Sequence, residues 1–278
     1  MIDVNGTSLY FEDSGPGPSG SGRDSVPDAG WTGETVVFSH GLLWGTELFE
    51  PQVAALRGRY RCIAWDHRGQ GRSAADHRHT IDMELVWQDA VCLLEKLATG
   101  PVHFVGLSMG GFTALRMAAR RPDLVRSLVI IESSAEPEPL ENVPRYRMLT
   151  VATRLVGPRP LRARIAPIML GKSILADPAR KSEVERFVGI MSRRKDIWRA
   201  VNGVIDRAGV EAEVGRIRTR TLVVVGDEDV ATPCAKAESL VAAIPGARLV
   251  TIPRAGHSST VEEPAAVTAA MTGFLTER

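Results

Sequence analysis

The amino-acid sequence predicts an α/β fold with a mostly parallel central sheet and helices on both faces of that sheet. Short strands that are apolar throughout alternate with helical segments over residues 35–134 and again from residue 219 to the end. Strands without a polar face must be covered on both sides, as in a parallel sheet. The strand pattern is interrupted at residues 135–218. We therefore expect a core of residues 1–134 and 219–278, with residues 135–218 inserted in it as a helical cap.

The elements in the first part of the core follow from local patterns. Asn5-Gly6 lies between two short strand-like runs and predicts a β-hairpin. Residues 14–34 are rich in Gly, Pro and Ser and have no periodicity, so they predict a mobile surface loop. Apolar runs predict strands at residues 35–40, 60–66, 102–108 and 125–134. Apolar residues at helical spacing predict helices at residues 46–58, 82–98 and 110–121.

The last part of the chain resumes this alternation, while the cap has a different composition. Strands are predicted at residues 221–229 and 248–253, and helices at residues 233–244 and 262–277. The cap combines amphipathic helical segments with many arginines, among them Arg145, Arg147, Arg154, Arg162, Arg164, Arg193 and Arg194. We interpret these arginines as a solvated face. Binding of a phosphate or carboxylate group is the alternative.

The overall composition argues against several classes of protein. The 34 basic and 33 acidic residues give a net charge of +1, which provides no electrostatic reason to expect nucleic acid or an anionic membrane surface as a partner. Cys62, Cys92 and Cys234 lie far apart and form no cluster with histidine, so we expect free thiols rather than a disulfide framework or a structural zinc site. No run approaches the roughly 18 apolar residues of a membrane span. The N-terminus also lacks the pattern of a leader, so we expect a cytoplasmic protein.

The strongest local signal is Gly106-Leu107-Ser108-Met109-Gly110, which lies between a predicted strand and a predicted helix. A serine at such a tight turn is lifted above the edge of the sheet. It also lies near the free N–H groups of a helix N-terminus, which favour developing negative charge. We therefore predict that Ser108 is a catalytic nucleophile. A glycine-rich turn with an incidental serine is the alternative.

Ser108 needs partners, because a serine hydroxyl is a weak nucleophile at neutral pH without an adjacent base. Among the six histidines, only His257 lies in a loop that follows a late strand, so we predict that it is the base. A carboxylate must then fix the tautomer of the imidazole and stabilise its charged form. We predict Asp229, which closely follows another buried strand. Asp227 is the second candidate for this acid and Glu132 the third.

The position of Ser108 at the edge of the sheet also predicts where an oxyanion hole and a substrate pocket lie. Acyl transfer needs N–H donors for its oxyanion, and we predict the backbone N–H groups of Leu42 and Met109. The substrate pocket is expected between the cap and the core. The candidates for its walls are Trp44, Met109, Leu140, Met148, Ile168, Met169 and Trp198, and ordinary core packing is the alternative for each.

These motifs together resemble the α/β-hydrolase family, and within it the group of esterases, lactonases and cofactor-free haloperoxidase-like proteins. The matching pieces are His40-Gly41, Asp66–Ser73, Gly106–Gly111, Gly226–Asp229 with Thr232-Pro233, and Gly256-His257. The stretch 40–73 is most similar to 3-oxoadipate enol-lactonase-like members. In this family the three residues occur in the order Ser108, Asp229, His257. The long stretch at 14–34 and the arginine-rich cap depart from the family pattern.

The resemblance implies a serine hydrolase that cleaves a carboxylic ester or lactone of a small apolar molecule through an acyl-enzyme. No metal or cofactor is expected. A serine nucleophile argues against the haloalkane dehalogenases and epoxide hydrolases, which resemble this family but use aspartate. A C–C bond hydrolase or a perhydrolase with the same triad and a non-catalytic ligand receptor are the alternatives. The expected partner is the small substrate, and a homodimer is compatible with the sequence.

Overall fold

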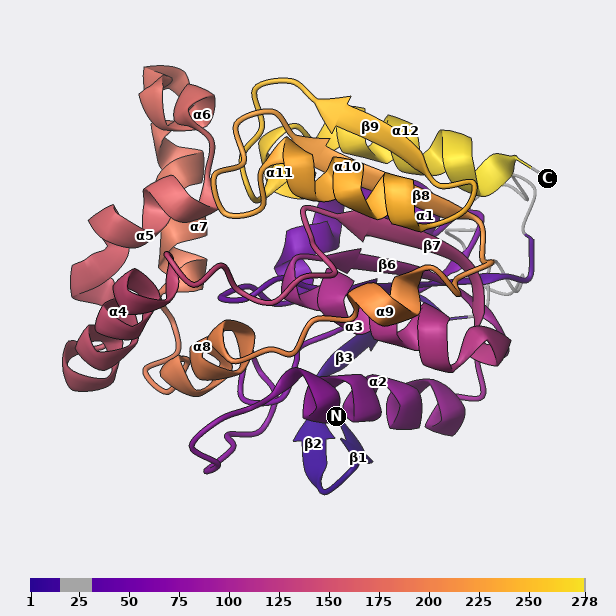
Figure 1. Cartoon of the computed structure of the whole chain (residues 1–278), viewed down its shortest axis with the longest axis horizontal. Helices are drawn as coiled ribbons and strands as arrows, with labels where there is room; N and C mark the ends of the chain where they lie inside the picture. The colour runs from indigo at the N-terminus through magenta and orange to yellow at the C-terminus, as the bar shows by residue number, and fades with distance from the viewer. Residues whose placement is uncertain (16–31, 278) are drawn as a thin grey trace, which may run out of the picture.

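The computed structural model describes residues 1–15 and 32–277, so most of the loop predicted at 14–34 lies outside the described residues. Within them, seven strands form one sheet in the order β3-β5-β4-β6-β7-β8-β9 (Figure 1). The strands are β3 (Phe11–Asp13), β4 (Thr35–Ser39), β5 (Arg61–Trp65), β6 (Val102–Leu107), β7 (Val125–Ile131), β8 (Thr221–Gly226) and β9 (Arg248–Ile252). All neighbours are parallel except β3, which runs antiparallel to β5. The predicted fold class is confirmed.

The chain begins with the predicted hairpin. Strand β1 (Ile2–Val4) pairs antiparallel with β2 (Thr7–Leu9). Asn5 and Gly6 connect the strands with φ angles of 44° and 72°. Positive φ at both central residues matches a type I′ turn, whose twist fits that of the paired strands. The edge strand β3 was not predicted, because three residues ending in Glu12-Asp13 are too short and too polar to give a strand pattern.

Alternate residues of the strands pack into two apolar layers, one on each face of the sheet. Val36 and Phe38 face the layer covered by α1 (Glu50–Leu56) and α12 (Pro264–Thr276). Val37 and Ile63 face the layer covered by helices from the other side. These helices are α2 (Met83–Lys96), α3 (Met109–Arg120) and α10 (Cys234–Ala243). Burial on both faces explains why the strand sequences are apolar throughout.

The chain between β7 and β8 is helical. Its helices are α4 (Val143–Val156), α5 (Arg162–Met169), α6 (Lys172–Ala176), α7 (Lys181–Met191), α8 (Trp198–Ile205) and α9 (Glu211–Val214). Helices α4–α7 form a group at the left of Figure 1, beside the body of the sheet, and α8 lies between that group and the core. Helix α9 instead contacts α3 and α10. We call α4–α8 the cap helices. No described helix is long and apolar enough to cross a bilayer.

A fully buried arginine ties the turn after β5 to the rest of the core. The guanidinium of Arg68 lies 3.0 Å from the carboxylate of Asp76 and 2.6 Å from that of Asp89 on α2. It also donates to the backbone oxygen of Asn5 in the hairpin. Because both partners are buried with it, the ion cluster holds three separate segments in one arrangement.

Candidate active site

Ser108 lies at the sharp turn between β6 and α3. Its backbone has φ 51° and ψ −111°, a conformation that non-glycine residues rarely adopt. The Ser108 N–H donates to the Ile131 oxygen at 2.9 Å, which anchors the turn to β7. A Cβ atom at Gly106 would overlap the backbone of Gly110, and one at Gly110 would overlap the oxygen of Ser39. The two glycines are therefore needed because backbone segments approach closely on both sides of the serine.

The structure brings the three residues predicted for catalysis into one line of hydrogen bonds. The Ser108 Oγ lies 2.8 Å from His257 Nε2, and His257 Nδ1 lies 2.8 Å from Asp229 Oδ2. All three side chains are buried. They come from loops that follow β6, β8 and β9, so the carboxyl ends of three parallel strands supply the group. This geometry has a hydroxyl, an imidazole and a carboxylate within direct proton-transfer distance.

The carboxylate of Asp229 is oriented by four donors. Its Oδ1 accepts the backbone N–H groups of Ala231 and Thr232, and its Oδ2 accepts the Thr232 hydroxyl at 2.7 Å and the His257 ring N–H. Asp227, the second candidate for the acid, accepts the backbone N–H of Arg254 at 2.7 Å. It therefore fastens one strand-end loop to the next rather than contacting the imidazole.

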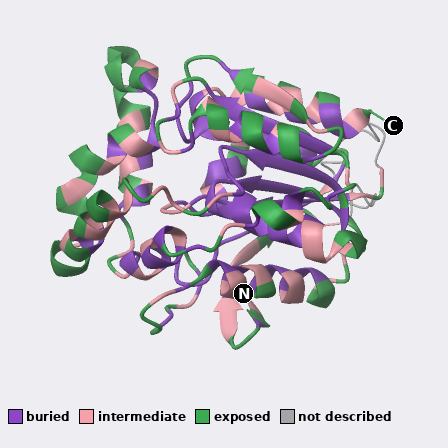
Figure 2. Cartoon of the chain, in the orientation of Figure 1, coloured by how far each residue is buried: buried purple, intermediate pink, exposed green. Residues whose placement is uncertain are grey.

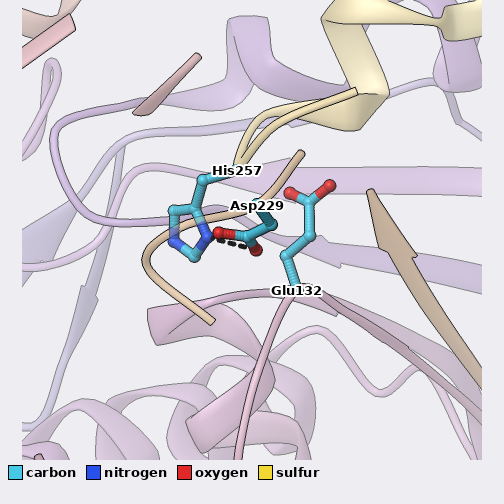
Figure 3. A group of neighbouring side chains, drawn as sticks. All are labelled: Glu132, Asp229 and His257. Atoms are coloured by element: carbon cyan, nitrogen blue, oxygen red, sulfur yellow. Dashed lines mark hydrogen bonds and ion pairs between the residues drawn. The ribbon is translucent and has the colours of Figure 1, made fainter. Parts of the chain in front are cut away.

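Glu132, the third candidate, is a buried neighbour of this pair (Figure 3). Its carboxyl lies within 4.8 Å of the Asp229 carboxylate and the His257 ring nitrogen, and it accepts the backbone N–H of Ser259. Complete burial raises the pKa of Glu132 well above its usual value, and the negative charges of Asp229 and Glu262 raise it further. Glu132 therefore binds a proton more readily than an ordinary carboxyl does, beside the hydrogen-bonded pair of Asp229 and His257.

Glu132, Asp229 and His257 are also residue types that commonly bind metal ions, and their side chains lie close together. The His257 and Asp229 atoms that face each other already share a hydrogen bond, and the Asp229 oxygens also accept hydrogen bonds from Ala231 and Thr232. The arrangement is saturated by protein donors. This hydrogen-bonded geometry fits a proton relay to Ser108 better than it fits a coordination site.

The two predicted oxyanion donors lie beside the serine. Met109 is the first residue of α3, a position whose N–H has no partner within its helix. Leu42 lies in the loop after β4, and both Leu42 and Ser108 line the same pocket. In the described part of the chain, the Leu42 N–H donates to no protein acceptor. Both residues therefore lie beside Ser108, which is compatible with the predicted role of their N–H groups as oxyanion donors.

Two buried side chains, those of His40 and Gln70, hold this donor loop, and neither was predicted from the sequence to have a role. The His40 Nε2 accepts the backbone N–H of His67 at 2.9 Å, so its Nδ1 carries the proton that it donates to the Gly41 oxygen at 2.7 Å. Burial lowers the pKa of His40, which keeps the imidazole neutral and this tautomer in place. The Gln70 Oε1 accepts the N–H of Leu43 at 3.2 Å. The His40-Gly41 motif and the Asp66–Ser73 turn, which contain His40 and Gln70, were the sequence features that could have indicated these roles.

A pocket between the cap helices and the core opens onto Ser108 and His257. Two of the predicted wall residues, Ile168 and Met169, line it. The remaining apolar walls come mostly from the cap and include Leu43, Phe112, Leu149, Ile165, Ile197, Val201, Val204 and Ile205. Glu138 and Arg207 are the lining residues that carry full charges, and they pair at 2.7 Å. The pocket therefore offers an apolar space with no net charge.

Five of the seven residues predicted for the pocket walls do not line it, so these predictions were wrong. Met109 is fully buried beneath the pocket residues, and Leu140 is 85% exposed to solvent. Trp44 is 1% exposed, donates its indole N–H to Ser258 Oγ and packs against Phe187 in the core. Trp198 packs against the ring of His79, outside the pocket. Met148 is 59% exposed, because α4 turns a different face toward the pocket. Large apolar side chains in a cap have several surfaces to cover, and residue type alone does not distinguish among them.

Comparison with known proteins agrees with this fold and site. Residues 36–270 match the model of the alpha/beta hydrolase family, and the chain belongs to this family. The molecule is accordingly an α/β-hydrolase enzyme.

Relatives and solved structures span nearly the whole chain. The RutD protein of Pseudomonas savastanoi pv. phaseolicola, named for carbamate hydrolysis, is 28% identical over 86% of this chain and 93% of its own. The enol-lactonase from Burkholderia xenovorans LB400 is 27% identical with a TM-score of 0.85, covering 99% of this chain and 98% of its own. A thermophilic esterase from Thermogutta terrifontis is 26% identical with a TM-score of 0.83, covering 97% and 93%. This chain is thus similar to hydrolases of several carbonyl compounds.

Proposed function

We propose that this α/β-hydrolase cleaves a carboxylic ester or lactone of a small apolar molecule through an acyl-enzyme on Ser108. The observation that carries the proposal is the unbroken line from the Ser108 hydroxyl through His257 to Asp229, with 2.8 Å at each step. Ser108 and His257 both line the apolar pocket, and the N–H groups of Leu42 and Met109 beside Ser108 are the proposed oxyanion donors.

The proposed reaction has two steps. The neutral His257 imidazole takes the proton of Ser108 as its oxygen attacks the carbonyl carbon, and Asp229 stabilises the imidazolium that forms. The N–H groups of Leu42 and Met109 hold the oxyanion of the tetrahedral intermediate. His257 then protonates the leaving alcohol. In the second step it activates a water that releases the acid from Ser108.

The pocket favours apolar esters and lactones over small polar substrates. Its walls are aliphatic over most of their length, and the charges of Glu138 and Arg207 offset each other. The enol-lactonase and the esterase among the structural neighbours act on the compound classes that this lining would accept. The RutD relatives are named for carbamate hydrolysis. A carbamate offers the same kind of carbonyl to Ser108, but a small polar one would leave the aliphatic walls without contact.

Hydrolysis of p-nitrophenyl acetate by the wild type and Ser108→Ala tests the proposal. We expect the substitution to lower kcat by about 10⁴-fold or more, and mass spectrometry of the wild type to detect the acylated chain during turnover. Ser239→Ala is the matched control, because Ser239 is an exposed helical serine that bonds only to its own helix. Equal activity of Ser108→Ala and the wild type would contradict the proposal. So would inactivity of both on a broad panel of esters, which would favour a ligand receptor.

A further inference from the structure

Helix α4 has an unusual distribution of side chains, because its outer face is more apolar than a solvent-facing surface normally is. Its inner face lines the pocket with Tyr146, Leu149, Thr150 and Thr153. A surface helix ordinarily turns its apolar stripe inward and exposes polar residues. Helix α4 instead places two threonines inside and leaves a row of large aliphatic side chains outside.

This outer row forms a continuous stripe. Met148, Val151 and Leu155 are 59%, 58% and 78% exposed. At about 100° per residue they fall within a sector of roughly 60° of the helix. Val156 is also exposed nearby, and Leu140 is exposed in the segment that leads into the helix. The outer turns of α4 and α5 are largely coloured as exposed in Figure 2, so no other described element covers them. We call Met148, Val151 and Leu155 the outer stripe.

Positive charge surrounds the outer stripe. On the same helical projection Arg145 and Arg154 lie on its two sides, about a quarter turn away. The segment of residues 142–176 contains six arginines and one lysine but no aspartate or glutamate. Arg145, Arg159, Arg162 and Arg164 form no ion pair with any described residue. The near-zero net charge of the whole chain therefore conceals a cap segment, residues 142–176, whose charged side chains are all positive.

We propose that this face of the cap, formed by the outer stripe and the arginines around it, docks on an anionic lipid surface. Exposed aliphatic side chains flanked by arginines match the two layers of such a surface, with acyl chains beneath anionic headgroups. A second copy of the chain fits less well, because a twofold contact through this face would bring two basic segments together without a carboxylate between them. An acidic protein would satisfy the arginines but would not require a row of aliphatic side chains.

Vesicle co-sedimentation of the full chain tests the proposal independently of catalysis. We expect binding to vesicles of equal parts phosphatidylcholine and phosphatidylglycerol, little binding to pure phosphatidylcholine, and a steep loss of binding with added salt. Val151→Ser/Leu155→Ser should weaken binding at least about tenfold. Arg159→Gln/Arg162→Gln should weaken it by a similar factor. Both pairs replace exposed side chains, so circular dichroism and thermal unfolding should match those of the wild type.

Arg57→Gln/Arg59→Gln is the control that removes the same charge from exposed positions outside the cap, and we expect it to bind like the wild type. If this control lost as much vesicle binding as Arg159→Gln/Arg162→Gln, total charge alone would govern binding. The proposed docking face would then be wrong. Absence of wild-type binding at low salt would also overturn it. So would a wild-type dimer that Val151→Ser/Leu155→Ser converts to a monomer, because the stripe would then be an interface between copies.

Discussion

The core and the cap of this hydrolase differ in how tightly their functional side chains are held. In the core, Asp229 accepts four hydrogen bonds, His257 is bonded through both ring nitrogens, and His40 fixes the neighbouring donor loop. In the cap, most of the pocket is lined by aliphatic side chains that only fill space. Proton transfer requires particular atoms at fixed distances, whereas an apolar wall requires only volume. The core should therefore tolerate substitution much less than the cap.

The largest expected effect is that of Asp229→Asn. An amide cannot stabilise the imidazolium, and it can present N–H to the nitrogen that now donates, so the wrong tautomer of His257 is favoured. We expect kcat for p-nitrophenyl acetate to fall by about 10⁴-fold. Asp227→Asn is the matched control, because an amide oxygen can still accept the N–H of Arg254, and its kcat should stay within about tenfold. Similar losses in both variants would remove the distinction between the two carboxylates.

The next effect concerns stability and contrasts a buried ion cluster with an exposed one. Arg68→Met leaves Asp89 buried without its cation and Asp76 with Arg78 alone, and we expect a loss of about 3–5 kcal/mol in the free energy of unfolding. Arg180→Met removes the pair with Glu183 on the cap surface and should cost less than about 1 kcal/mol. Denaturant unfolding measures both. Equal costs would show that burial does not set the value of these ion pairs.

The contrast between the core and the cap also explains which site residues could be predicted from the sequence. Ser108, Asp229 and His257 each follow a strand, so their convergence follows from the parallel order of β6, β8 and β9. Asp229 and Asp227 lie two residues apart after β8, and only the positions of the Thr232 and Arg254 N–H groups separate their contacts. The interpretation of Trp44, Met148 and Trp198 failed because helix packing angles decide which apolar side chains face a cavity. No motif encodes those angles.

A substitution in the pocket should change selectivity without changing the chemistry. Thr153 is buried on the inner face of α4, so Thr153→Phe should fill part of the pocket. We expect kcat/KM for p-nitrophenyl octanoate to fall about 10- to 100-fold, while that for the acetate stays within about twofold. Met148→Phe on the outer face of the same helix is the control and should leave both values unchanged. A fall for the acetate as large as that for the octanoate would indicate a distorted site instead of a filled pocket.

The smallest expected effect tests whether Glu132 holds its proton beside Asp229. The pKa of Glu132 is raised in the folded state, so between its unfolded and folded pKa values the native chain binds more protons than the unfolded chain. Stability from this group is therefore fully present at acidic pH and decreases as pH rises through that window. Glu132→Gln keeps an oxygen for the Ser259 N–H but cannot ionise. Relative to the wild type, we expect it to be nearly neutral at about pH 5 and to gain on the order of 1 kcal/mol by about pH 8. Urea unfolding at the two pH values measures this gain, and a relative stability that is constant or decreases with pH would mean that Glu132 is ionised in the folded chain.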